Sequence, residues 1–438
     1  MASPLHSLRE KREPVRITRA LQHRNYRLFF SGQTVSLVGT WITRIATSWL
    51  VYRLSGSVFL LGVVGFFGQI PTLLLAPFAG VLVDRWNRHR ILVITQVLSM
   101  LQSVGLAVLT FAGIITVVDV LLLQLAQGVI NAFDTPARQA FVVEMVNDRS
   151  DLPNAIALNS TMVNASRIIG PSIGGVLIAA VGEGWCFTAD AISYLAVIAS
   201  LIAMRLDKRD TAPKETRVWE DLRAGFAYVA RFVPARDSLL LLALVATMGM
   251  PYTVLMPAIA STILHGGPHT LGYLMTASGT GALGGALYLA SRRSVLGLGR
   301  AIVIATITFG TALIAFSFSH YLWLSLLVLP FVGGGMMVEM ASTNTILQTI
   351  VDDSLRGRVM AFYTMAFLGT APLGSLLAGL SADHIGPMRT ILFGGASCIV
   401  GGAIFALRLP KLRTHVRPIY IERGIIVVTE VEAGTKSL

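Results

Sequence analysis

The chain has 438 residues, of which 54% are hydrophobic and only 13% are charged, whereas a soluble globular protein has about 25% charged residues. Its apolar residues form repeated runs of about twenty, the length that crosses about 30 Å of hydrocarbon, which excludes a soluble multidomain protein. A formal net charge of +12 would by itself suit a nucleic-acid partner, but the positions of the charges argue against one.

Taken in chain order, the apolar runs predict twelve membrane-spanning helices, six before and six after one long polar linker. The predicted spans cover residues 26–52, 57–82, 91–112, 117–135, 154–181, 185–205, 238–262, 270–290, 300–318, 321–346, 358–381 and 388–408. We therefore expect an all-α membrane protein with two six-helix bundles. Its parts would be a tail at 1–24, a first bundle at 25–205, a linker at 206–236, a second bundle at 237–409 and a tail at 410–438.

The polar segments carry their own signals. Residues 1–24 are basic and lack the apolar core of a signal peptide, so the first span is expected to act as its own insertion signal. The linker places apolar residues at helical spacing opposite charged ones, which predicts an amphipathic helix on the inner leaflet. In the last tail, 419–422 and 425–431 could pair as a small hairpin, with disorder or docking on the bundle as the alternatives.

The basic residues lie almost entirely on one side of the predicted spans. Only Arg53 and Arg389 fall in loops on the other side, and Arg44 and Arg167 lie within spans. This bias predicts that both termini are cytoplasmic and that the protein is a multi-pass protein of the inner (plasma) membrane. A basic face toward anionic lipid explains the charge without a nucleic-acid partner.

The loop between the second and third spans is GVLVDRWNRHRIL, residues 80–92, with the spacing G-x-x-x-D-R-x-x-R. It resembles the corresponding loop of the major facilitator superfamily of secondary transporters, and the resemblance implies the major facilitator fold. It also implies that Asp84 latches the inner ends of the two bundles, with Arg85 and Arg88 as partners and Gly80 as a close-packing point. A plain positive-inside anchor is the alternative. Asn87 and His89 depart from the family pattern, and the corresponding loop of the second half has no acidic residue.

The fifth span contains GPSIGG, whose Gly170, Pro171, Gly174 and Gly175 match the core of a motif found in antiporters and exporters of the superfamily. The motif's earlier small residues are missing here. Pro171 would kink the helix and the glycines would allow close helix contact, so ordinary packing is the alternative. More specifically, segments 25–57, 131–146 and 152–171 resemble a bacterial exporter branch of the superfamily that includes the enterobactin exporter and macrolide efflux proteins.

Charged residues inside spans are costly and therefore suggest function. The resemblance implies that the first, fourth, seventh and tenth spans line a central cavity. The candidates for substrate or proton contact are Arg44, Asn131, Asp134, Asn164, Arg167 and Glu339. Glu339 is the preferred proton carrier, with a static ion pair to Arg167 or Arg44 as an equal alternative, and Asp134 could instead belong to an inner gate with Arg138.

Two further expectations concern residues near these candidates. We expect Asp190 to lie outside the cavity and to be structural. Several aromatic residues are expected to face the cavity: Trp41, Trp49, Tyr252, Tyr273 and Tyr363.

The sequence offers no sign of an enzyme. Cys186 and Cys398 are too few and too far apart for a disulfide framework or a metal cluster, and no nucleotide-binding or catalytic signature stands in a credible context. We therefore expect a monomeric transporter without metal or cofactor that exports a small amphipathic compound, drug-like or siderophore-like, by proton antiport. The alternatives are an importer or lipid flippase of the same fold and, less favoured, a membrane enzyme or signalling scaffold.

Overall fold

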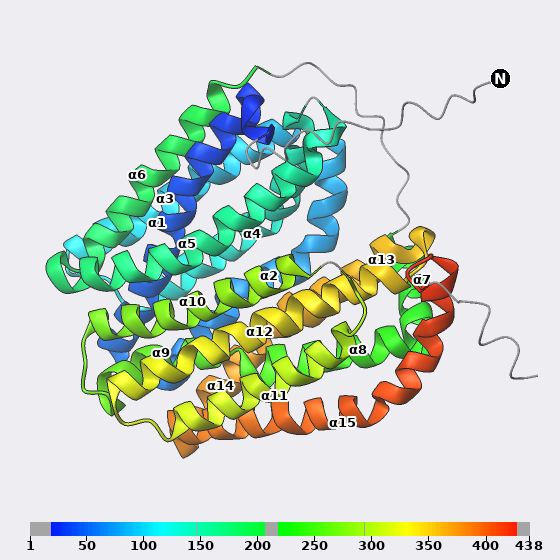
Figure 1. Cartoon of the computed structure of the whole chain (residues 1–438). Helices are drawn as coiled ribbons and strands as arrows, with labels where there is room; N and C mark the ends of the chain where they lie inside the picture. The colour runs from blue at the N-terminus through cyan, green and yellow to red at the C-terminus, as the bar shows by residue number, and fades with distance from the viewer. Residues whose placement is uncertain (1–18, 147, 206–217, 293, 427–438) are drawn as a thin grey trace, which may run out of the picture.

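The computed structural model describes residues 19–146, 148–205, 218–292 and 294–426, and within them every regular element is a helix (Figure 1). The first half contains α1 (Arg24–Ser55), α2 (Val58–Arg85), α3 (Arg88–Phe111), α4 (Val117–Met145), α5 (Leu152–Val181) and α6 (Glu183–Ile202). Short 3-10 turns, η1 (Arg19–Gln22) and η2 (Arg149–Asp151), precede α1 and α5. In this half α1 packs on α5 and α6, α3 packs on α4 and α6, and α2 packs on α4.

Local sequence explains where several of these helices begin. The Ser57 hydroxyl and the Asn87 side chain accept hydrogen bonds from backbone N–H groups in the first turns of α2 and α3. Thr116 and Asp119 form a reciprocal capping box at the start of α4. Such caps satisfy N–H groups that have no partner inside the helix.

The second half is less regular because two of its long helical runs are interrupted. It contains α7 (Val218–Arg231), α8 (Val233–Leu244), α9 (Tyr252–Ala258), α10 (Pro268–Ser291), α11 (Leu298–Ser317), α12 (Leu322–Ile350), α13 (Asp353–Thr364), α14 (Ala371–Ile385) and α15 (Pro387–Glu422). The π-helical turn η3 (Val245–Gly249) joins α8 to α9, η4 (Ile259–Ile263) follows α9, and η5 (Met365–Gly369) joins α13 to α14. Pro251 and Pro372 follow η3 and η5 closely, and a proline cannot donate the hydrogen bond that would keep the helix regular.

The two halves meet along two helix pairs, α5 with α10 and α2 with α14. Both contacts are made through glycines. A Cβ atom on Gly175 would lie 2.7 Å from the Cα of Gly272, and one on Gly62 would lie 2.8 Å from the Cα of Gly379. The backbones therefore touch directly, as small residues permit in membrane helices.

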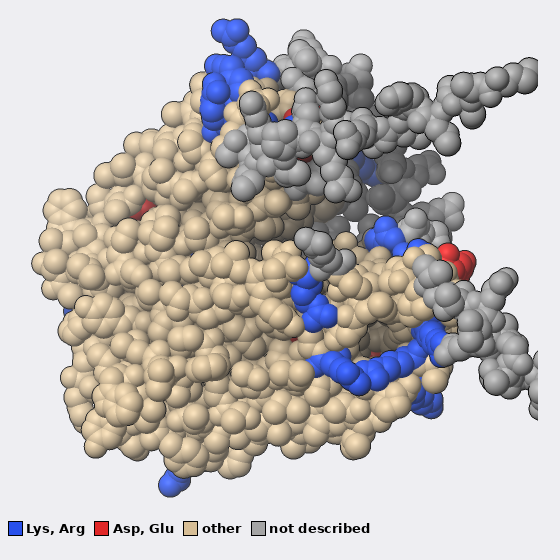
Figure 2. Space-filling model, in the orientation of Figure 1, with Lys and Arg blue, Asp and Glu red and all other residues tan. Residues whose placement is uncertain are grey.

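The chain reverses direction from one span to the next, so the molecule has two ends (Figure 1). We call the end where α1 begins and α6 finishes the basic end, because Lys and Arg side chains gather there and around α13 and α15 (Figure 2). The opposite end, with the turns at Gly56, Gly113, Gly182 and Gly386, is the distal end. All four of these glycines have positive φ, which favours glycine. The glycine contacts between the halves lie near the distal end.

Among the described residues, ten helical runs are long and apolar enough to cross a membrane: 58–75, 88–111, 117–145, 154–181, 183–202, 233–263, 298–317, 322–350, 355–385 and 387–422. Helices α1 and α10, of 32 and 24 residues, are not among these ten but pack within the two halves. Large apolar side chains such as Leu407, 82% exposed, cover the outside, and a broad belt without charge separates the two ends in Figure 2. The chain is a multi-pass membrane protein.

Two predictions about polar segments are corrected or limited by the structure. Residues 419–422 are not a strand, because α15 continues for 36 residues through Pro410 to Glu422. Leu412 and Val416 are buried four residues apart, a helical spacing that packs this extension against the protein. Residues 427–431, the other half of the predicted hairpin, lie outside the described residues, as do 206–217 of the linker. Of the rest of the linker, residues 218–231 form α7, which packs on α13, and residues 233–236 begin α8.

Candidate functional site

A cavity of about 1250 Å³ lies between the two halves. Its lining begins at Leu61 and Val64 of α2, next to the distal glycine contacts, and extends to Gly80, Arg138 and Arg358 near the basic end. Backbone contacts between glycines of the two halves lie beside its distal end, and its lining residues reach the basic end. Ordinary ligand sites have volumes of about 300–1,000 Å³, so this one is large enough for a drug-sized molecule.

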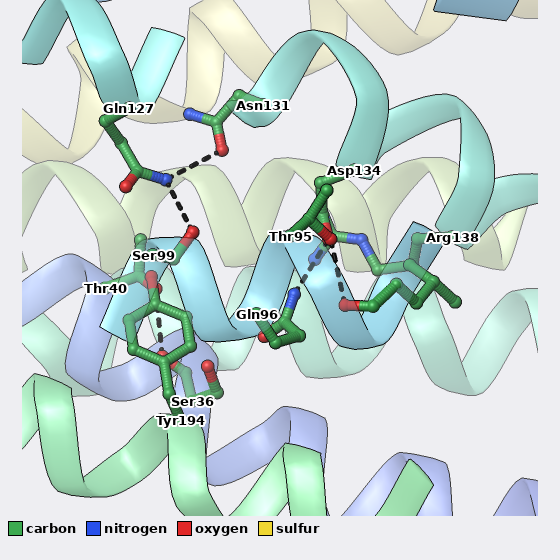
Figure 3. Close-up of polar contacts among 11 residues, drawn as sticks. Ser36, Thr40, Thr95, Gln96, Ser99, Gln127, Asn131, Asp134, Arg138 and Tyr194 are labelled. Carbon is green, nitrogen blue, oxygen red and sulfur yellow. Dashed lines mark hydrogen bonds and ion pairs between the residues drawn. The ribbon is translucent and has the colours of Figure 1, made fainter. Parts of the chain in front are cut away.

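The wall contributed by the first half is mainly polar. Its polar lining residues come from α1, α2, α3, α4 and α6: Thr40, Thr43, Arg44, Thr47, Ser48, Gln69, Thr72, Gln102, Gln124, Gln127, Asn131, Thr135, Arg138, Asp190 and Tyr194. Several of these side chains are tied to one another. The Gln127 Nε2 donates to Asn131 Oδ1 and to the Ser99 hydroxyl, each at 3.1 Å (Figure 3).

The wall contributed by the second half is mainly apolar. Its apolar lining side chains come from α9, α10, α13 and η5: Val254, Leu271, Met275, Ala361, Phe362, Met365 and Leu368. Thr253, Thr364 and Arg358 are its polar members, and Arg358 lies near the basic end. The cavity therefore offers hydrogen-bonding groups on one side and apolar surface on the other.

Asp134 faces α3 rather than the cavity. Its carboxylate accepts hydrogen bonds from Gln96 Nε2 at 2.8 Å and Thr95 Oγ1 at 3.0 Å, and Arg138 lies 3.5 Å away (Figure 3). The residue is only 6% exposed and is not part of the cavity lining. Asp134 thus contacts Arg138, the residue named in the inner-gate alternative, whereas Asn131, about one turn earlier on α4, lines the cavity.

Glu339 does not have the cavity contact expected for it. Helix α12 contributes no residue to the lining, and Glu339 is 1% exposed behind the wall. Its Oε1 accepts a hydrogen bond from the Thr343 hydroxyl at 3.3 Å, and its Oε2 has no partner among the described residues. The alternative ion pair with Arg44 or Arg167 does not form within the part of the chain that the structure describes.

The two intramembrane arginines share one aromatic ring. The guanidinium carbons of Arg44 and Arg167 lie 5.1 and 5.5 Å from the centre of the Trp41 ring. Arg44 is exposed to the cavity and lines it, whereas Arg167 is half-buried and does not. Asn164, one turn before Arg167, donates to the Ser160 carbonyl at 2.9 Å and is also outside the lining.

The predicted aromatic lining is wrong for this structure. None of Trp41, Trp49, Tyr252, Tyr273 and Tyr363 lines the cavity; Tyr194 and Phe362 do. A helical run of apolar residues does not reveal which face a bulky side chain occupies, and Tyr252 instead packs inward to hydrogen bond the Ser278 hydroxyl at 2.6 Å.

Sequence reasoning missed Asp190. The residue lines the cavity, is 1% exposed, and accepts a hydrogen bond from the Ser103 hydroxyl at 2.9 Å. Helix α6 begins at Glu183, so Asp190 lies about 10 Å along the helix from its start. That depth, and a serine three residues later at Ser193, were the available signals for an intramembrane acid.

The two motifs make different contacts. In the loop, a Cβ on Gly80 would meet nothing within 4 Å, so Gly80 is not the predicted close-packing point. Arg88 forms an ion pair with Glu144 of α4 at 2.6 Å, Arg85 is exposed at the end of α2, and the Asp84 side chain lies outside the described part of the chain.

In the fifth-span motif, every glycine is a contact point. A Cβ on Gly170 would collide with the Trp41 side chain, and one on Gly174 would lie 3.3 Å from the Cα of Ile42. Gly175 touches α10 of the other half, and Pro171 lies within α5. The motif thus packs α5 against both α1 and α10.

A model of the transmembrane secretion effector family, part of the major facilitator superfamily, matches residues 18–420. The chain belongs to this family. Among relatives of this secretion effector, the staphyloferrin A transporter of Staphylococcus aureus is 28% identical over 387 residues, 88% of this chain and 96% of the relative. The multidrug efflux pump Tap of Mycolicibacterium fortuitum is 30% identical over 88% of this chain and 95% of the pump. The enterobactin exporter EntS of Citrobacter koseri is 22% identical, with 90% and 94% covered.

Solved structures show the same fold. A bacterial homologue of the human lysosomal transporter Spinster matches with a TM-score of 0.67 at 15% identity, covering 91% of this chain and 98% of that chain. The peptide transporter POT matches with a TM-score of 0.72 at 11% identity, covering 90% and 95%. The family and these neighbours are transporters, so the chain is a major facilitator transporter of the efflux branch and not an enzyme.

Proposed function

We propose that this secretion effector exports small amphipathic compounds, drug-like or siderophore-like, by alternating access. The observation that carries the proposal is the cavity with one polar and one apolar wall. A compound with both kinds of surface gains hydrogen bonds on one side and buries apolar area on the other. The relatives support export as the direction, since they include an enterobactin exporter and a multidrug efflux pump.

The proposed architecture has twelve spans in two six-helix bundles. Helices α1 and α10 complete the ten runs of sufficient hydropathy, and the polar cavity residues of α1 account for its lower hydropathy. Residues 25–205 would rock against 237–409 around the cavity, with the basic end and both termini in the cytoplasm. Asp84, with Arg85 and Arg88, is the proposed latch between the basic ends of the bundles, and the transporter is proposed to act as a monomer.

Proton antiport is the proposed source of energy. Glu339 and Asp190 are the buried carboxyls for this role, because neither has a cationic partner within the described residues. A carboxyl without a fixed cation can exchange a proton without breaking an ion pair. Asp190 lines the cavity, so a proton bound there would be coupled directly to the substrate. Glu339 lies behind the cavity wall, so a proton bound there would be coupled to the substrate only through a change of conformation.

The test is accumulation of a panel of amphipathic dyes and antibiotics in a pump-deficient bacterial host. Cells that express the intact protein should accumulate less of some compound, and a protonophore should abolish the difference. Glu339→Gln and Asp190→Asn should each be compared at matched membrane expression, with Arg53→Gln at the distal end as a charge-removal control. Loss in one variant alone would identify the proton site.

Vesicles of opposite orientation test the direction. Uptake into inverted vesicles, driven by an imposed pH gradient, is expected for an exporter. Uptake into right-side-out vesicles alone would establish the importer instead. Movement of a labelled phospholipid between leaflets, without uptake of any soluble compound, would establish a flippase.

A further inference from the structure

Two arginines in the membrane interior have no acidic partner in the part of the chain that the structure describes. Arg44 and Arg167 come from α1 and α5, and both guanidinium groups lie over Trp41. Within the described residues, no hydrogen bond or ion pair joins either guanidinium to a protein group. Each guanidinium carries five N–H donors; Arg44 lines the cavity, and Arg167 lies behind the lining on the same tryptophan.

Within the described residues, none of the acids on the surrounding helices forms an ion pair with Arg44 or Arg167. Asp134 is bonded to α3 and to Arg138, Asp190 accepts from Ser103, and Glu339 lies behind the cavity wall. A charged donor inside a membrane protein is costly unless it has an acceptor. Two like charges held near one ring repel each other, which increases the cost of leaving them without an acceptor. The acceptor must therefore come from the cavity, to which Arg44 is exposed.

The tryptophan between the arginines is fixed in position. Gly170 of α5 lies so close to Trp41 that a Cβ atom there would collide with the Trp41 side chain. Arg167 is one turn before Gly170, and Arg44 is one turn after Trp41. The close approach of α1 and α5 thus sets both guanidinium groups around one indole, where cation–π contact holds them without neutralising them.

We propose that Arg44 binds a carboxylate group of the transported compound while Arg167, behind the lining, adds positive charge, so that the substrates are amphipathic carboxylic acids. The guanidinium fork matches a carboxylate in two-bond geometry, which a cationic or neutral drug cannot offer. The rest of the compound would lie toward Leu271 and Met275 on the apolar wall. This inference rests on the proposed export function, and it specifies the chemical class that the cavity accepts.

The test is equilibrium binding to the purified full chain in detergent, with 2-naphthylacetate and its uncharged methyl ester as probes. The intact protein should bind the carboxylate more tightly than the ester. Arg44→Gln should weaken carboxylate binding about ten- to a hundredfold, the loss expected for hydrogen bonds to a charged group, and should weaken ester binding far less. Arg167→Gln should weaken carboxylate binding by a smaller factor, because Arg167 lies behind the lining and acts through its charge alone. Arg358→Gln, which removes the same charge from the basic end of the cavity, should have a smaller effect.

Several outcomes overturn the inference: equal binding of carboxylate and ester, binding of neither up to the solubility limit, or arginine variants that bind the carboxylate normally. Thermal unfolding of the intact protein covers the case in which a variant does not fold. The carboxylate should raise the unfolding temperature of the intact protein and the ester should not. Because these measurements need no transport, normal binding without export would contradict only the proposed function. Export of uncharged compounds without carboxylate binding would contradict only this inference.

Discussion

The two walls of the cavity differ although the two halves of the chain have related helical arrangements. The first half presents threonines, glutamines, Arg44 and Asp190, and the second presents mainly Val254, Leu271, Met275 and Phe362. The contrast indicates that the two halves contribute differently to substrate binding. The first half provides orientation through directional bonds, and the second provides affinity through apolar contact, which tolerates many shapes.

The strongest way to break this contrast is to place a charge on the apolar wall. Met275→Glu should reduce export of amphipathic compounds at least about tenfold, because an unpaired carboxylate would face the apolar part of the substrate. Initial efflux rates in energised cells give the measurement. Gln69→Glu, on the polar wall, is the matched control and should reduce export less. Equal losses in the two variants would mean that the walls do not differ in function.

The polar wall depends on a second layer of bonds between α3 and α4. Asp134→Asn should lower the stability of the purified protein by about 1.5–3 kcal/mol, because the charge-assisted bonds from Gln96 and Thr95 weaken and Arg138 loses its partner. Denaturant unfolding in detergent provides the measurement. When Asp134→Asn is made in a protein that already carries Arg138→Gln, it should lower the stability by less, because the ion pair is already absent. An equal loss of stability in both backgrounds would show that the ion pair contributes nothing.

A smaller effect is expected from the amide network at the cavity surface. Gln127→Leu removes both bonds to Ser99 and Asn131 and should destabilise the protein by about 1 kcal/mol. Thermal unfolding followed by circular dichroism would detect the change. Gln124→Leu is the control, since its one bond, to Thr47, is long at 3.5 Å. A larger loss for Gln124 would contradict the assignment of the network.

The smallest effect should come from a change of polarity at constant shape on the apolar wall. Val254→Thr replaces a methyl group with a hydroxyl and should weaken binding of an exported dye about two- to tenfold, since part of an apolar contact is lost. Fluorescence titration of the purified protein gives the affinity. Thr253→Val, the neighbouring position with the reverse change, should not weaken it. Tighter binding by Val254→Thr would show that this wall is not apolar in function.

Sequence patterns predicted the helical runs well where apolar residues end abruptly. The fifth span was expected at 154–181, and α5 covers Leu152–Val181. The predicted fourth span ended too early, at residue 135, because charged residues such as Asp134 and Arg138 usually mark the membrane surface. The helix continues to Met145 since Thr95 and Gln96 satisfy that charge from α3. Such compensation depends on a contact distant in sequence.

The site was harder to predict than the helices. Periodicity shows that Gln127, Asn131 and Asp134 share a stripe, but a stripe does not tell which neighbour each residue faces. Gln127 and Asn131 line the cavity, whereas the Asp134 side chain turns to α3. For Glu339 and Asp190 the expectations were reversed, because the facing direction of each helix is fixed by packing between the halves. No spacing within a single helix contains that information.

The glycine seams at the distal end bear on the speed of transport. Gly175 meets Gly272, and Gly62 meets Gly379, backbone against backbone, and a single hydrogen bond between the Ser172 and Thr276 hydroxyls, at 2.6 Å, lies beside the first of these contacts. Parting such surfaces requires neither rotamer changes nor the breaking of ion pairs, and the exposed backbone groups remain bonded within their own helices. The two helix pairs can therefore separate at the distal end with a low energetic barrier. A bulky residue at any of the four positions would hold the paired helices apart. It should change the turnover rate of transport before it changes which compounds the protein binds.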